Sequence, residues 1–135
     1  MEIFNLVVLA LSGMLLCYAG LNRLVKPISS LCLTGYAKNS DIELKHKSDI
    51  YNEMRSAGAQ LFLSGIIILL GIFIPTVEFW SFVIATITFL GYAFGRIVSL
   101  KVDGKVCKEL MSGLYSEIIL GVLNFICMMI ILFSV

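Results

Sequence analysis

Histidine, proline and charged residues are scarce in this sequence of 135 residues. Charged residues make up 14% of it, against about a quarter in soluble proteins. The single histidine, His46, lies between two lysines, and the four cysteines show no CxxC spacing, so the sequence predicts neither a metal site nor a cofactor. Because 59% of the residues are hydrophobic, the composition predicts one membrane domain, with no room for a soluble module.

Four long apolar stretches predict four transmembrane helices. They cover residues 3–25, 50–74, 80–100 and 114–135, and each holds 21 to 25 residues. A helix of about 20 residues crosses the hydrocarbon core. The first stretch has neither a basic segment before it nor a small-x-small cleavage site, so we interpret it as a helix and not as a secretory signal. We therefore expect an all-α, integral membrane four-helix bundle, antiparallel and up-down-up-down, as a single transmembrane domain over residues 1–135.

Basic residues fall on one side of this arrangement. All ten lysines and arginines lie in the 26–49 and 101–113 connections or within two turns of them, whereas the other side carries only Glu2 and Glu78. Short loops follow the positive-inside rule, so we expect both connections to be cytoplasmic and both termini external, in the inner membrane. A short external turn is expected at residues 75–79.

The 26–49 connection is long for a helical hairpin. It either folds over the cytoplasmic ends of the bundle or forms a mobile tether, and the sequence favours neither alternative.

Glycines predict where the helices touch, because helices in lipid associate through close contact of small residues. Gly91-x-x-x-Gly95 lies on the third predicted helix. Such a motif marks a contact within the chain, or a contact with a second copy or a partner membrane protein.

The two halves of the chain resemble each other. Tyr18-Ala19, followed by Arg23, recurs as Tyr92-Ala93 followed by Arg96. Tyr51-Asn52-Glu53 recurs in the same way as Tyr115-Ser116-Glu117. We hypothesise two duplicated helical hairpins related by an axis along the membrane normal. The alternative is chance similarity of residues that are common near membrane interfaces.

Polar side chains concentrate in the cytoplasmic third of the predicted helices. Ionisable groups cost roughly 2.5 to 3.5 kcal/mol at the centre of a spanning helix, so they usually face the bundle and pair. Glu53 and Gln60 share one face of the second helix. The same spacing recurs at Glu117 and Asn124 on the fourth. We predict a polar pocket centred on Glu53, Arg96 and Glu117; the alternative is a structural ion pair between Arg96 and either carboxylate. The candidate binding residues are Asn52, Glu53, Arg55, Gln60, Tyr92, Arg96, Asp103, Glu117 and Asn124.

Two segments resemble a family of small bacterial membrane proteins, domain of unknown function 4345. The first is Asn52-Glu53-Met54-Arg55-Ser56-Ala57-Gly58, followed by Gly65 and Gly71. The second is Gly95-Arg96-Ile97-Val98-Ser99-Leu100 with Asp103-Gly104, and Glu117 also fits. The similarity covers almost the full length, and it implies a four-helix integral membrane protein with no assigned activity. It favours Asn52, Glu53, Arg55, Arg96, Asp103 and Glu117 as the shared polar set.

Two classes of function stay open. The first is a non-enzymatic accessory protein, or a protein that binds a lipid or another amphiphile, in which Arg96 holds an anionic headgroup and Arg23 extends to the lipid headgroups. The second is a small membrane enzyme in which Glu53 and Glu117 carry protons in general acid–base chemistry on a lipid. A transporter ranks last because the outer halves of the helices are apolar, and nothing in the sequence favours nucleic-acid binding.

Overall fold

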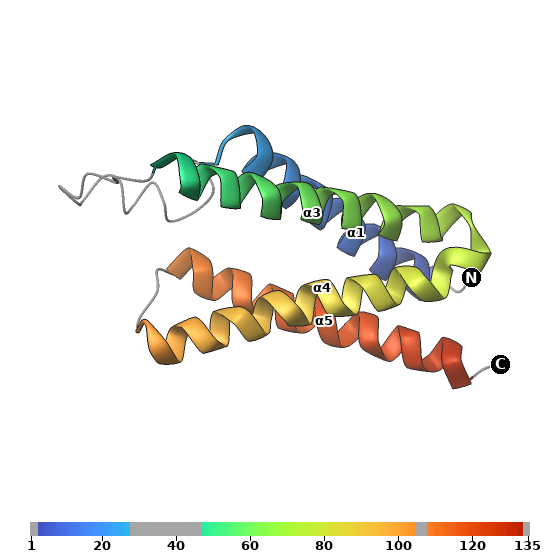
Figure 1. Cartoon of the computed structure of the whole chain (residues 1–135). Helices are drawn as coiled ribbons and strands as arrows, with labels where there is room; N and C mark the ends of the chain where they lie inside the picture. The colour runs from blue at the N-terminus through green and yellow to red at the C-terminus, as the bar shows by residue number, and fades with distance from the viewer. Residues whose placement is uncertain (1–2, 28–46, 105–107, 134–135) are drawn as a thin grey trace.

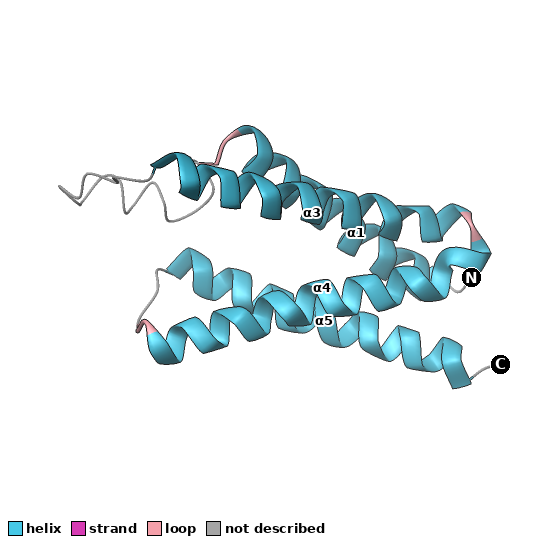
Figure 2. Ribbon diagram, in the orientation of Figure 1, coloured by secondary structure: helices cyan, strands magenta, loops and turns pink. Residues whose placement is uncertain are grey.

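The computed structural model describes residues 3–27, 47–104 and 108–133, and within these ranges the chain forms four long α-helices and no strand (Figures 1 and 2). They are α1 (Ile3–Val25), α3 (Lys47–Phe73), α4 (Pro75–Val102) and α5 (Lys108–Phe133). Each contains a stretch that is long and apolar enough to cross a membrane. The start of α1 and the end of α5 lie at the same end of the molecule as the α3–α4 junction (Figure 1). The predicted all-α, up-down-up-down integral membrane bundle is confirmed.

The prediction that residues 75–79 form a turn is wrong, because these residues are helical. Helix α4 begins at Pro75, and only Ile74 separates it from the end of α3. Proline at the first helical position loses no intrahelical hydrogen bond, and its fixed φ suits a helix start. Pro75 therefore begins a helix as well as ending one, and α3 and α4 are adjacent, antiparallel elements.

Much of the connection predicted at residues 101–113 is also helical. Helix α4 continues to Val102, and α5 begins at Lys108, six residues before the predicted start at Leu114. Helix α4 ends where Asp103 donates its backbone N–H to the carbonyl of Ser99 at 2.7 Å and Gly104 adopts a φ of 93°, a conformation that favours glycine. Apolar stretches mark only the membrane-embedded part of a helix, so they end before the helix does.

Helix α3 likewise begins at Lys47, three residues before the predicted start. The prediction that the 26–49 connection covers the bundle falls mainly on residues 28–46, which lie outside the described residues.

The bundle is built from two closely packed helix pairs, α1 with α3 and α4 with α5, which are joined mainly by contacts between α3 and α4 (Figure 1). Glycines bring α1 and α3 together. A Cβ atom added to Gly20 would lie 2.7 Å from the carbonyl oxygen of Gly58, and one added to Gly65 would lie 2.8 Å from the backbone nitrogen of Cys17. The first pair is therefore held by backbone-to-backbone contact, as expected for helices in lipid.

Apolar side chains and a few paired polar groups fill the interior. Asn124 of α5 is fully buried, and its side-chain N–H groups donate to the hydroxyl of Ser12 on α1 and to the carbonyl of Leu120, both at 2.8 Å. The core residues around these groups are Val8, Leu9, Leu16, Leu61, Ile68, Phe82, Ala85, Phe89 and Cys127. The bond between Asn124 and Ser12 connects the two helix pairs inside the apolar region, where unpaired polar groups are costly.

Candidate functional site

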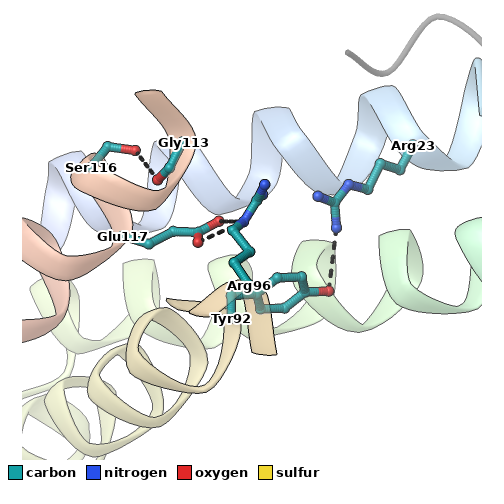
Figure 3. A network of polar contacts seen from close by, with 6 residues as sticks. All are labelled: Arg23, Tyr92, Arg96, Gly113, Ser116 and Glu117. Carbon is teal, nitrogen blue, oxygen red and sulfur yellow. Dashed lines mark hydrogen bonds and ion pairs between the residues drawn. The ribbon is translucent and has the colours of Figure 1, made fainter. Parts of the chain in front are cut away.

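Arg96 and Glu117 form an ion pair between α4 and α5 (Figure 3). The Nε atom of Arg96 lies 3.0 Å from Oε1 and 2.8 Å from Oε2 of Glu117, and the two side chains are 20% and 13% exposed. The sequence left open whether Arg96 pairs with Glu53 or with Glu117. The structure pairs it with Glu117, so the two charges offset each other within the second helix pair.

Arg23 reaches across from α1 to Tyr92 on α4 (Figure 3). Its Nη1 donates to the Tyr92 hydroxyl at 3.3 Å, and its guanidinium carbon lies 5.3 Å from the centre of the Tyr92 ring, within range of a cation–π interaction. Among the described residues, no carboxylate forms an ion pair with Arg23. The side chain predicted to extend to the headgroups thus turns toward the bundle.

An open groove of about 570 Å³ lies between the two helix pairs, and both guanidinium groups line it. Its lining includes the last turn of α1 and the last third of α4. The groove therefore lies at the end of the bundle away from the α3–α4 junction. The polar lining residues are Arg23, Gln60, Thr88, Tyr92, Arg96 and Ser99, and the other lining residues are Leu61, Ile87, Gly91, Gly95 and Leu110. The groove therefore joins a cationic region to an apolar wall.

Gly91 and Gly95 form part of this wall and make no close helix contact within the described chain. Both are exposed, and a Cβ atom added to either would have no atom within 4 Å. The absence of side chains at these two positions leaves the space that the groove occupies.

The predicted site residues separate into three groups. Gln60, Tyr92 and Arg96 line the groove, and Glu117 is joined to it through Arg96. Asn124 lies in the core, bonded to Ser12. The remaining candidates are exposed and do not line the groove: Asn52, Glu53, Arg55 and Asp103.

The exposed candidates include one with a clear local role. Asp103 accepts a hydrogen bond from the Ser99 hydroxyl at 2.8 Å, next to the end of α4. Glu53, which was predicted at the centre of the pocket, makes no contact with Arg96. The three-residue centre predicted from the sequence therefore reduces to the Arg96–Glu117 pair.

The sequence interpretation did not place Arg23, Thr88 or Ser99 in the candidate site, and of these Arg23 is the charged one. A signal for it was present, because Arg23 and Arg96 occupy corresponding places in the two similar segments that follow Tyr18 and Tyr92. Both arginines line the groove. The duplication itself stays a prediction, to be tested by superposing α1 and α3 on α4 and α5.

Within the described ranges, no three histidine, cysteine or acidic side chains lie close enough together to hold a metal ion. The described lining of the groove offers cationic, hydroxyl, amide and apolar groups.

Four helices that are long and apolar enough to cross a membrane indicate a multi-pass membrane protein. The chain belongs to the family described as Domain of unknown function (DUF4345), whose model matches residues 4–128. No match is found among curated proteins or among solved structures.

Proposed function

We propose that this protein binds one membrane amphiphile in the groove and acts as a non-enzymatic binding or accessory protein. The observation that carries the proposal is the combination of two guanidinium groups with an apolar wall in one open space of about 570 Å³. Binding sites for small molecules are concave, mostly apolar, carry a few polar groups and span roughly 300 to 1,000 Å³. Exposed Gly91 and Gly95 leave the groove open at its side, where a lipid would enter from the bilayer.

The enzymatic alternative has less support. General acid–base chemistry with two carboxylates requires both to reach the same substrate. Glu117 is engaged by Arg96, whereas Glu53 is exposed and outside the groove lining. Among the described residues, no carboxylate lines the groove, and Glu117 is joined to it only through its ion pair with Arg96.

Filling the groove tests the binding proposal. Gly91→Leu is expected to reduce binding at least tenfold while leaving thermal stability unchanged, because the new side chain enters open space. The measurement is photo-crosslinking in phosphatidylcholine vesicles containing phospholipids with a diazirine in the acyl chain, followed by mapping of the labelled peptides.

The matched control is Val122→Leu, which enlarges an exposed residue of α5 outside the groove lining. It should leave crosslinking intact. Crosslinks that are absent from the groove peptides, or that persist in Gly91→Leu, would contradict the proposal. Disulfide crosslinks between two copies of a Gly91→Cys or Gly95→Cys variant, made in a cysteine-free background, would instead assign this face to a homo-oligomer.

We further propose that the groove lies in the cytoplasmic leaflet of the inner membrane. The support is the charge pattern: Arg23, Lys26, Arg96 and Lys101 lie at the end of the bundle that holds the groove, whereas Glu78 lies at the other end. Under the positive-inside rule, the basic end is cytoplasmic and both termini are external.

Single cysteines in a cysteine-free background test this orientation. Thr76→Cys, at the start of α4, is expected to react with a membrane-impermeant maleimide on intact cells. Lys101→Cys, at the end of the same helix, should react only after permeabilisation. Both positions are exposed, so the reverse labelling pattern would place the groove in the outer leaflet.

A further inference from the structure

Among the described residues, the charges at the groove do not cancel. In that part of the chain, Arg23, Arg96 and Glu117 are the ionisable groups that line the groove or pair with its lining, apart from the phenol of Tyr92. Glu117 offsets the charge of Arg96 through its ion pair. Arg23 has no carboxylate within ion-pair distance among the described residues, and Glu117 acts on it only as a weaker, longer-range charge than on Arg96, so one positive charge is left over.

Arg23 also has hydrogen-bonding capacity to spare. A guanidinium group has five N–H donors. Among the described residues, the side chain of Arg23 donates to the Tyr92 hydroxyl and makes no other hydrogen bond. A cation within a spanning segment is costly unless it is paired, and guanidinium groups bind phosphate and carboxylate oxygens through two parallel hydrogen bonds.

The apolar wall extends from this cationic region toward the middle of the membrane. Ser99 and Arg96 lie at one end of the α4 lining and Ile87 lies at the other. The thirteen residues from Ile87 to Ser99 span about 18 Å along the helix axis, a length on the scale of an extended acyl chain. Gly91 and Gly95 lie along this length and leave it open.

We propose that the ligand is an amphiphile with a single negative charge, a phosphodiester lipid or a fatty-acid carboxylate, whose charged group binds Arg23 beside Tyr92. Its acyl chain lies along Gly91 and Gly95 toward Ile87. This inference rests on the proposed amphiphile-binding function and adds the charge of the ligand and the residue that recognises it. In this proposal Arg23 binds the headgroup, and not Arg96 as the sequence predicted, because Glu117 offsets the charge of Arg96.

Three probes with the same diazirine-labelled chain test the proposal in phosphatidylcholine vesicles: phosphatidylglycerol, free fatty acid and phosphatidylcholine. At least one of the two anionic probes is expected to label the groove at a concentration at least tenfold lower than the zwitterionic probe. Which of the two labels better identifies the source of the anion. Arg23→Gln is expected to remove this preference, and Arg23→Lys, which keeps the charge, should retain part of it.

The matched control is Lys101→Gln, which removes one positive charge from an exposed position outside the groove lining. It should keep the preference for the anionic probe. Equal labelling by all three probes in the unaltered protein, or an unchanged preference in Arg23→Gln, would overturn the charge assignment and leave the binding function standing. No groove labelling by any probe would remove both. If Arg23→Gln does not fold, the comparison of probes in the unaltered protein decides alone.

Discussion

Gly20→Ala is expected to destabilise the bundle by about 3 kcal/mol, at the upper end of the range for overpacked interiors. The added Cβ atom would overlap the backbone nitrogen of Phe62 and lie 2.7 Å from the carbonyl oxygen of Gly58. Both neighbours are backbone atoms of α3, so they cannot move aside as a flexible side chain would. Relief requires α1 and α3 to separate along their contact, and this loosens the dispersion contacts that hold helices together in lipid.

Titration of the purified protein with sodium dodecyl sulfate in mixed micelles, followed by circular dichroism, would measure this loss. Gly91→Ala is the matched control, because it makes the same chemical change on α4 with no atom within 4 Å of the new Cβ. Its stability should stay equal or rise by about 1 kcal/mol from the higher helix propensity of alanine. Equal unfolding midpoints for Gly20→Ala and the unaltered protein would show that the α1–α3 contact is not tight.

Hydropathy predicted most of the fold, because a bilayer requires each spanning segment to be long, apolar and hydrogen-bonded within itself. The helix ends were less predictable. They depend on local backbone chemistry, such as the start of α4 at Pro75 and its end beside Gly104. Whether a proline ends one helix or begins the next depends on the chain on both sides, and hydropathy does not report this.

The candidate site was predicted only in part, for a geometric reason. Helical spacing correctly placed Tyr92 and Arg96 on one face of α4, and both line the groove. Spacing within a helix does not fix how the helix is rotated against its neighbours. The stripe that begins with Glu53 therefore starts on the exposed surface of α3, although Gln60 of the same stripe reaches the groove.

The glycine pattern shows the same limit. Gly91 and Gly95 have the spacing of a helix contact, yet the close contacts of the first helix pair are made at Gly20, Gly58 and Gly65. A small residue permits close approach but does not require it. Within the described part of this chain, the two permissive positions on α4 line an open space and contact no other helix closely.

Removal of one partner of the Arg96–Glu117 pair is expected to have the second large effect. Glu117→Gln should cost about 2 kcal/mol, less than the roughly 3 to 5 kcal/mol seen for fully buried pairs, because both side chains keep some exposure. The reason is that Arg96 would stay inside the spanning region with its charge unmatched. The double variant Arg96→Gln/Glu117→Gln removes both charges and should recover at least half of the loss.

The measurement is the same detergent unfolding, analysed as a double-mutant cycle. Glu53→Gln is the matched control, because Glu53 is exposed and forms no ion pair with Arg96 in the described structure. Its stability should change by less than about 0.5 kcal/mol. Additive single-variant losses in the cycle would show that the two charges do not interact, and Arg96 would then be available to a ligand together with Arg23. If the cycle shows coupling, Arg96 stabilises the α4–α5 pair, and Arg23 carries the charge that a ligand would meet.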